Sequence, residues 1–144
     1  MATTEISHVI AQYHAAVDAI LRGNAELLNS LYSHRDDIIL ATPFGPPIVG
    51  WTQVSEQMAY HATRFREGNQ ISTELLAQYV SPELFTIMEI EHAQVKVGGR
   101  DELSPIHLRV TSIFRLEDGT WKLVSRHADP ISSFDQDGPL RNDH

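Results

Sequence analysis

Apolar side chains recur at helical spacing in three stretches of the first half of the chain. The first stretch, residues 4–22, ends at Gly23, and Asn24 then caps a second, shorter helix that runs through Tyr32. The third stretch runs from about Gly50 to Glu67 and ends at Gly68-Asn69. The apolar stripes of the two longer stretches are Ile6, Ile10, Tyr13, Val17, Ile20 and Leu21, and Trp51, Val54, Met58, Ala62 and Phe65. This pattern predicts three helices.

Strand-like segments follow the helices. They cover residues 37–42, 70–80, 84–97, 103–116 and 120–131. The proline-rich segment 43–47 excludes regular structure after the first strand. The last four strands have no helix between them, so we expect an antiparallel sheet, and Asp118-Gly119 marks a tight hairpin between the last two.

The last strand carries the most informative polar residues. Strand periodicity of two places Trp121, Leu123, Ser125, His127 and Asp129 on one face. The Cα atoms of His127 and Asp129 would then be about 6.6 Å apart. An imidazole beside a carboxylate is a common general base near neutral pH, so we expect His127 and Asp129 to line a cavity as a catalytic pair, with Ser125 as a ligand contact. The alternative is structural: Asp129 satisfies local backbone donors before Pro130, and His127 is simply hydrogen-bonded.

Three helices followed by a long sheet predict an α+β domain. We expect the helices to cover one face of a cone-shaped, curved antiparallel or mixed sheet that wraps around a pocket. A single domain is expected over residues 1–131. Residues 132–144 are polar and lack an apolar period, so a loose C-terminal tail is expected there.

Composition narrows the classes of function. The 144 residues are 42% hydrophobic, which suffices for a core without metals or disulfides. The absence of cysteine excludes thiolate catalysis and cysteine zinc sites. A net charge of −8, with 11 basic residues scattered among 19 acidic ones, disfavours nucleic acid as a partner. No apolar run is long enough to cross a bilayer and the start has no basic segment before an apolar one, so we expect a cytoplasmic protein with no membrane partner.

Three segments carry a resemblance to a known superfamily: AQYHAAVDAILRGNAELLNSLY, ATPFGPPIVGW and FRLEDGTWKLVSRHADP. With the order of elements, they resemble the nuclear-transport-factor-2-like superfamily, in its SnoaL-like and ketosteroid-isomerase-like branch. The resemblance covers residues 6–131. It implies a cone-shaped fold and a small-molecule pocket, but the superfamily includes isomerases, dehydratases, cyclases, epoxide hydrolases and binding or assembly domains, so the fold does not determine the function.

The resemblance also implies roles for single residues. Tyr13 falls where the isomerases place the tyrosine of their oxyanion hole, which shares that duty with a protonated aspartate. Thr42 stands where they carry the general-base aspartate, and Ser112 stands where they carry the second oxyanion-hole acid. A threonine hydroxyl cannot accept a proton near neutral pH, so steroid isomerisation by that mechanism is not expected. Ser112 can still donate a hydrogen bond. Tyr13 has the alternative of being a core residue with a satisfied hydroxyl.

Other candidates for ligand contact lie on the third helix, the proline-rich loop and the sheet. Phe44 and Trp51 would serve equally as loop anchors or as an apolar lid. Met58 and His61 would border the pocket mouth, with a surface position as the alternative for His61. Phe114 lies on the apolar stripe of its strand and would contact both core and ligand.

No metal or cofactor is expected. Alternation separates Glu89 and Glu91 from His92, so the three cannot converge on an ion. We expect the two glutamates to face solvent or a subunit interface, offset by Arg109 or Arg115. The sequence has no glycine-rich phosphate loop and no dinucleotide-binding fingerprint.

Two functions remain open. The first is a cofactor-independent acid–base enzyme, of isomerase, dehydratase or cyclase type, in which His127 and Asp129 transfer protons while Tyr13 or Ser112 donates to a carbonyl. The second is a non-catalytic ligand-binding, dimerisation or assembly domain. In both cases we expect a small-molecule ligand. We also expect a homodimer, because the outer face of the sheet is half apolar and half charged.

Overall fold

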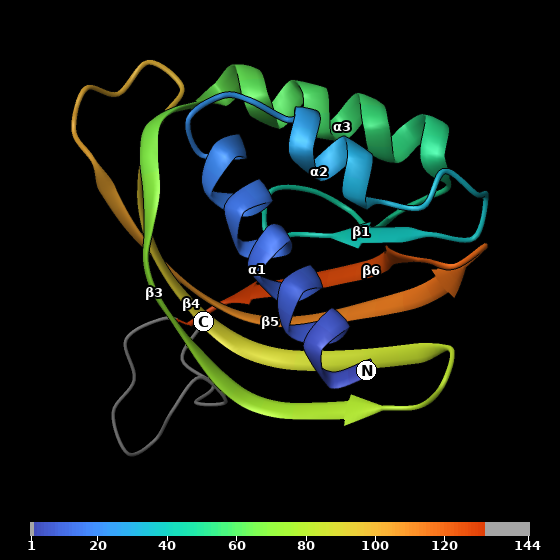
Figure 1. The fold of residues 1–144 in the computed structure, drawn as a ribbon. Helices are drawn as coiled ribbons and strands as arrows, with labels where there is room; N and C mark the ends of the chain where they lie inside the picture. Colours follow the sequence, from blue (N-terminus) through green and yellow to red (C-terminus); the bar gives the residue numbers. More distant parts are fainter. Residues whose placement is uncertain (1, 132–144) are drawn as a thin grey trace, which may run out of the picture.

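Helices come first and strands after in the computed structural model, which describes residues 2–131 (Figure 1). The helices are α1 (Ala2–Ile20), α2 (Glu26–Leu31) and α3 (Trp51–Arg64). The strands are β1 (Ile39–Ala41), β2 (Ile48–Val49), β3 (Phe65–Val80), β4 (Leu84–Val97), β5 (Ser104–Glu117) and β6 (Thr120–Pro130). No helix in this part of the chain is both long and apolar enough to span a bilayer. The tail expected at 132–144 lies outside the described residues.

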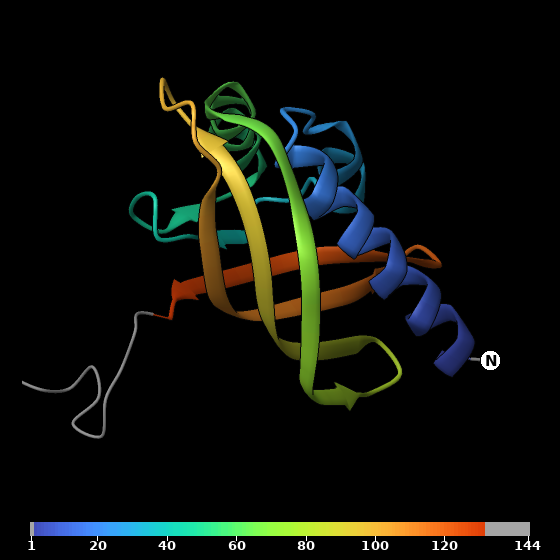
Figure 2. The same ribbon diagram turned by 90° about the vertical axis from the view of Figure 1, so that its left-hand side faces the viewer.

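All six strands form one sheet in the order β2-β1-β6-β5-β4-β3. Among these strands only β1 and β6 pair in parallel, so the sheet is mixed, and the predicted α+β class is confirmed. Three register shifts in the pairing of β3 with β4 bend these strands strongly. The sheet consequently curls around α1, with α2 and α3 closing the wide end of the cone (Figures 1 and 2).

The β5–β6 hairpin forms at the predicted dipeptide. Asp118 and Gly119 have φ values of 51° and 82°, and Glu117 pairs with Thr120. Positive φ at both central residues is the requirement of a two-residue type I′ turn, which aspartate and glycine tolerate best. This turn fixes the register in which β6 leaves the hairpin.

The structure departs from the predicted boundaries at two places. The third helix ends at Arg64 rather than near Glu67, because Phe65 already pairs with Val97 and starts β3. Gly68-Asn69, expected to end that helix, lies inside β3 at an irregularity of its pairing. The strand β2 was not expected, and it pairs antiparallel with β1 across the proline-rich loop.

The core lies between the helices and the concave face of the sheet. Its largest fully buried side chains include Tyr13, Phe85, Phe114, Met58 and Leu123, all within one apolar cluster. Phe65, which the sequence places on the same apolar stripe as Met58, belongs to a second cluster with Leu21, Ala93 and Val95. The two clusters leave space between them, and this space is the cavity described below.

A β-bulge in β6 determines which side chains face that space. Ile113 pairs with Ser125 and Phe114 pairs with Leu123, so Val124 is an extra residue without a partner in β5. An extra residue reverses the faces of all residues that follow it. Leu123 points into the core before the bulge, and Arg126 and Ala128 are the buried residues after it.

Candidate functional site

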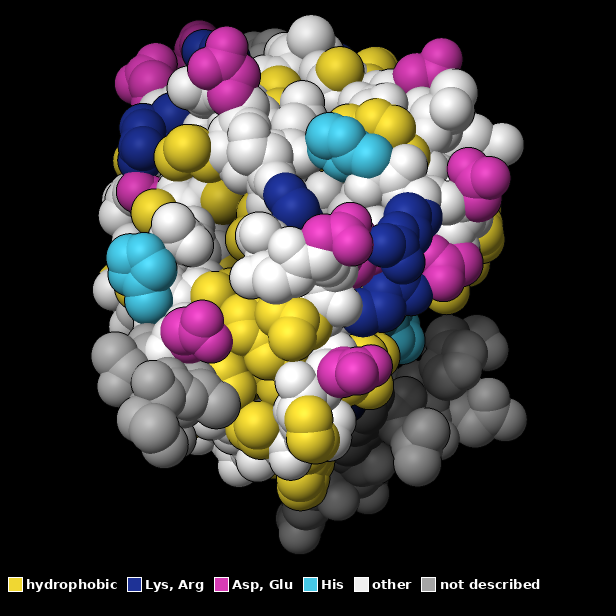
Figure 3. All heavy atoms as spheres, turned by 45° about the vertical axis from the view of Figure 1, so that its right-hand side comes forward, with side chains coloured by type: hydrophobic (Ala, Val, Ile, Leu, Met, Phe, Trp, Pro, Cys, Tyr) yellow, Lys and Arg dark blue, Asp and Glu magenta, His cyan; other side chains and the backbone are white. Residues whose placement is uncertain are grey.

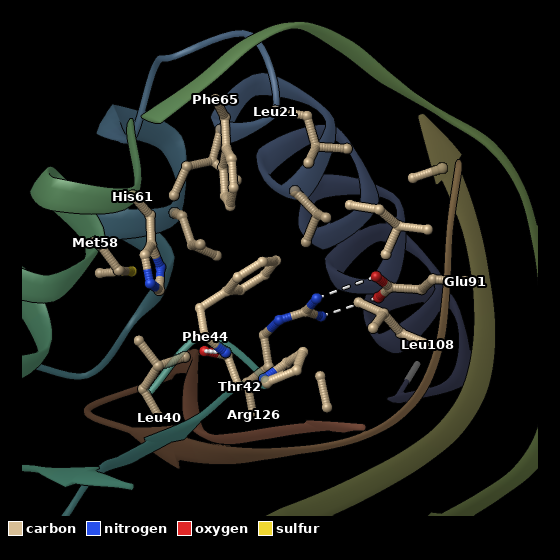
Figure 4. A pocket seen from close by; sticks show the side chains of 17 residues that line it. Leu21, Leu40, Thr42, Phe44, Met58, His61, Phe65, Glu91, Leu108 and Arg126 are labelled. Atoms are coloured by element: carbon tan, nitrogen blue, oxygen red, sulfur yellow. Dashed lines mark hydrogen bonds and ion pairs between the residues drawn. The ribbon is translucent and has the colours of Figure 1, made fainter. Parts of the chain in front are cut away.

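An apolar cavity of about 70 Å³ lies at the wide end of the cone, between α1, α3 and the concave side of the sheet. Its apolar lining comes from all three helices, from the segments that follow α1 and β1, and from β1, β3, β4, β5 and β6. It includes Val17, Leu21, Leu40, Met58, Leu108 and Ala128. Only four polar side chains of the described residues line it: Thr42, His61, Glu91 and Arg126. His61 lies at one end and the Glu91–Arg126 pair lies at the other, with Phe44 between them (Figure 4).

Glu91 and Arg126 form a buried, two-pronged ion pair. Nη1 and Nη2 of Arg126 donate to the two carboxylate oxygens of Glu91 at 2.9 and 3.0 Å. Nη1 also donates to the hydroxyl of Tyr13, which in turn lies 2.6 Å from Oγ of Ser112. Paired hydrogen bonds of this kind fix the plane of the guanidinium, so the orientation of Arg126 is set from both sides.

The charges of this network follow from its burial. Burial raises the pKa of Tyr13 to about 12, so its hydroxyl stays protonated and donates to Ser112 while accepting from Arg126. Burial alone would lower the pKa of Arg126, but its interactions with Glu91 and Tyr13 together offset burial and raise the pKa well above the ordinary value. The guanidinium is therefore a permanent cation at the end of an apolar cavity.

His61 brings a neutral imidazole to the opposite end. Its side chain is only 6% exposed, and burial lowers its pKa below the usual value. Nε2 of Gln57 donates to Nε2 of His61 at 3.0 Å, and the rings of Phe44 and Phe65 pack against the imidazole. At neutral pH the cavity lining thus holds a neutral base at one end and a fixed cation at the other.

Four of the predicted ligand contacts line the cavity: Thr42, Phe44, Met58 and His61. Thr42 and Phe44 come from the loop after β1, where Oγ1 of Thr42 accepts from the backbone N–H of Phe44 at 3.2 Å. This bond shapes the start of the loop that holds Phe44 against the cavity. Phe44 is nevertheless 47% exposed, so it lies between the cavity and solvent.

The other four predicted contacts lie elsewhere. Phe114 stacks on Phe85 inside the core, with ring centroids 4.5 Å apart, and Trp51 stacks on His34. Ser112 lies behind the lining, where its hydroxyl meets that of Tyr13. Ser125 sits at the bulge and does not line the cavity.

The expectation that His127 and Asp129 face the cavity is wrong. Their side chains are 60% and 50% exposed and meet on the outer face, with Nε2 of His127 3.5 Å from Oδ1 of Asp129. The bulge at Val124 is the cause, because it shifts the alternation by one and turns Arg126 inward in place of His127. Tyr13, the third predicted catalytic residue, does point toward this region, but as the support of Arg126 rather than as part of the lining.

The expectation for Glu89 and Glu91 is also wrong. Both are 2% exposed, and neither meets Arg109 or Arg115. Oε2 of Glu89 pairs with Nε2 of His14 at 2.7 Å, while Oε1 of Glu89 has no partner among the described residues. The sequence carried a signal for this burial, since both glutamates share the period-two phase of the apolar positions Phe85, Ile87, Ala93 and Val95.

No group of three or more His, Asp or Glu residues converges as a set of metal ligands in residues 2–131. His92, on the outer face, contacts His107 and Glu74 instead.

The cone-shaped mixed sheet, covered by three helices, is the architecture of the nuclear-transport-factor-2-like proteins. The SnoaL-like domain model matches residues 6–131, and the chain therefore belongs to the SnoaL-like family. None of the curated proteins compared with the chain matches it.

Solved structures share the fold at low sequence identity. A nuclear transport factor 2-like superfamily protein from Salmonella enterica has a TM-score of 0.75 at 16% identity, over 90% of this chain and 91% of that one. A ketosteroid isomerase-like protein from Erwinia carotovora has a TM-score of 0.74 at 16% identity, over 90% and 96%. A candidate scytalone dehydratase from Novosphingobium aromaticivorans has a TM-score of 0.72 at 14% identity, over 90% and 84%. At such identities the likeness concerns the fold alone.

The His14–Glu89 pair predicts a pH-dependent stability. The hydrogen bond to Glu89 raises the pKa of His14, so the imidazolium stabilises the fold fully below the unfolded pKa near about 6.5, and this contribution is lost as the pH rises through the folded pKa. His14→Gln should lower the free energy of unfolding by about 1.5 to 3 kcal/mol at about pH 6, and by less at about pH 9. Urea unfolding at both pH values measures the difference. His8→Gln, at an exposed position of the same helix, serves as control, and an equal loss for His14→Gln at both pH values would contradict the prediction.

Proposed function

We propose that this protein is a cofactor-independent acid–base enzyme that acts on a small, largely apolar carbonyl compound bound in the cavity. The proposal is supported above all by one observation: a neutral imidazole and a permanently charged guanidinium lie at opposite ends of the same apolar cavity. Proton abstraction next to a carbonyl, as in isomerisation, dehydration or cyclisation, requires such a base and such an electrophile.

Arg126 takes the role of the electrophile. A guanidinium has five N–H donors, and three of them are used by Tyr13 and Glu91 among the described residues. The remaining two belong to a side chain that lines the cavity, where they can donate to a carbonyl oxygen and stabilise the enolate that forms.

His61 takes the role of the base. Both oxygens of Glu91 accept from Arg126, so the carboxylate is the poorer proton acceptor of the two acid–base groups in the lining. The neutral imidazole has one basic nitrogen, and the donor from Gln57 occupies it at Nε2. Base action therefore requires the Gln57 amide to turn over, so that its oxygen accepts from Nε2–H and Nδ1 becomes the basic nitrogen. A proton taken from substrate can therefore be held at His61 without a carboxylate partner.

A non-catalytic ligand-binding domain is the second candidate. The observation that favours it is the small volume of the cavity, about 70 Å³, which is far below that of pockets for drug-sized ligands. A larger substrate requires displacement of Phe44, the partly exposed side chain that lies between the cavity and solvent.

Deuterium exchange separates the two candidates before any substrate is known. Cyclohexanone in deuterated buffer, followed by proton NMR, reports proton abstraction next to a carbonyl. The protein should accelerate the exchange, and His61→Asn should reduce the acceleration at least about a hundredfold. The rate should rise with pH through a pKa below the ordinary histidine value and then level off, because only the neutral imidazole is a base and burial lowers its pKa.

His127→Asn is the matched control, since His127 is an exposed histidine on the outer face of the sheet. It should leave the exchange rate unchanged. Cyclohexanone that binds without any exchange would favour the non-catalytic candidate, and exchange that persists in His61→Asn would remove His61 from the mechanism.

We also propose a homodimer formed through the end of the β3–β4 hairpin. Large apolar side chains are exposed there: Leu75, Leu76, Tyr79, Val80, Leu84 and Met88. Hydrophobic side chains gather on the lower part of the face in Figure 3, the level at which Figure 1 places the turn between β3 and β4. An exposed apolar patch on a sheet suits a second copy of the same chain, because a twofold axis pairs the patch with itself.

Light scattering tests this assembly. The parent should have twice the mass of one chain at micromolar concentration, and Leu76→Glu with Tyr79→Glu should yield monomers, because the charges would be buried unpaired. A monomer mass for the parent would contradict the proposal.

A further inference from the structure

Three of the arginines in the described part of the chain form no ion pair with a described residue. Arg22, Arg35, Arg109, Arg115 and Arg126 each form an ion pair with an aspartate or glutamate. Arg64, Arg66 and Arg100 form none with the described residues, although the chain carries 19 acidic residues against 11 basic ones. All three lie where the end of α3 and the start of β3 meet the loop between β4 and β5 (Figures 1 and 2).

The local structure holds this loop in place with one arginine and leaves the other two exposed. Nη2 of Arg66 donates to the carbonyl oxygens of Gly98 and Arg100 at 3.1 and 2.6 Å, and the backbone N–H of Gly98 donates to the carbonyl of Arg64 at 2.8 Å. The side chain of Arg66 therefore holds the loop in position. Arg64 and Arg100 are exposed and make no side-chain hydrogen bond to a described residue.

The absence of a side chain at Gly98 leaves room for the guanidinium of Arg64 beside the loop. A Cβ atom at Gly98 would lie 2.6 Å from Nη2 of Arg64, closer than real Cβ contacts, and the φ of Gly98 is 61°. The guanidinium of Arg64 therefore packs directly on the bare backbone of the turn, which limits how far it moves from the loop that carries Arg100.

Arg64 and Arg100 line an open groove of about 500 Å³ that adjoins the cavity. The groove and the cavity share Pro43, Phe44, Ile106 and Leu108 in their linings. Phe44 is the aromatic side chain common to both, and it is partly exposed, so it lies at the boundary between the apolar interior and the groove that the arginines line. A molecule that extends past Phe44 would have its apolar part in the cavity and its outer end beside two unpaired guanidinium groups.

We infer that the ligand of this cavity is an amphiphilic anion, whose carboxylate or phosphate group is bound by Arg64 and Arg100 at the mouth while its apolar body lies inside. The inference rests on the proposed function, since it assumes that the cavity is the ligand site. Guanidinium groups bind both kinds of oxyanion in forked geometry, so the structure assigns the anion and leaves its chemical source to experiment. Binding at the mouth also orients the reactive end of the molecule toward Arg126 and His61.

Matched acids and amides test the inference. Phenylalkanoates from phenylacetate to phenylhexanoate, the corresponding neutral amides and the corresponding phenylalkyl phosphates are titrated by calorimetry at low ionic strength. At the chain length that spans the mouth, an acid should bind at least about tenfold more tightly than its amide, because each charge-assisted hydrogen bond is worth about that factor. The preference should weaken at high salt. The comparison of carboxylates with phosphates then identifies the source of the anion.

The double variant Arg64→Gln with Arg100→Gln should abolish the preference for acid over amide and leave the affinity of the amide unchanged. Arg109→Gln is the control, because it removes the same charge from an exposed site on the outer face of the sheet. Arg100→Gln alone, in the loop, should give a partial loss if the double variant unfolds.

The outcomes separate this inference from the proposed function. Amides that bind while acids gain nothing would overturn the inference and leave the cavity as a ligand site. A preference for acids that survives in the double variant would also overturn it. No binding of either series would overturn the inference, while the cyclohexanone exchange would still decide the proposed function.

Discussion

The register of β6 after its bulge is the feature that sets the whole polar end of the cavity. One unpaired residue, Val124, turns Arg126 toward the concave face, and a buried guanidinium requires a buried carboxylate. Glu91 supplies it from β4, two strands away, and Tyr13 supplies a hydroxyl from α1. Three elements distant in sequence are thus tied together by one side chain.

The apolar surroundings give this interaction its chemical consequences. Burial keeps Tyr13 protonated and His61 neutral, while Glu91 keeps Arg126 charged. The low polarity of the lining strengthens the field of the guanidinium inside the cavity, because apolar side chains screen a charge far less than water does. Outside Phe44 the environment changes, and Arg64 and Arg100 face an open groove. The cavity therefore has an inner end suited to reaction and an outer end suited to recognition.

The fold was predictable because, within most elements, apolar side chains recur at one constant spacing, that of a helix or that of a strand. The strand predicted over residues 84–97 matches β4, and Asp118-Gly119 turns the chain where its conformational preferences require. The family resemblance gave the cone and the pocket, and Phe44, Met58 and His61 were recognised as candidates because their elements border that pocket. The positions of the helices and strands along the chain therefore follow from the local spacing of apolar residues.

The polar end of the cavity was not predicted, because it depends on a local break in the pattern. If the alternation of inward and outward side chains is continued without a break after Leu123, His127 points inward. The sequence indicates a shift of this alternation only through the adjacent apolar residues Leu123 and Val124 and through Ala128, an apolar residue in the opposite phase. Arg126 and Glu91 are also 35 positions apart, and nothing in either local segment identifies the other as its partner. The alternation in β4 places Glu89 and Glu91 among the buried residues. The sequence of this strand does not show which cationic partner makes the burial of a carboxylate possible.

A double-mutant cycle on Arg126 and Glu91 measures whether this ion pair forms inside the cone. Arg126→Met and Glu91→Gln should each lower the free energy of unfolding by about 3 to 5 kcal/mol, because each leaves a buried group without its partner. The double variant should lose much less than the sum, with a coupling of about 2 kcal/mol or more. The same cycle on the exposed pair Arg109 and Asp129, 3.9 Å apart on the outer face, should give a coupling of at most about 1 kcal/mol. Additive losses at Arg126 and Glu91, to within about 0.5 kcal/mol, would show that the two side chains do not meet and would contradict the site described above.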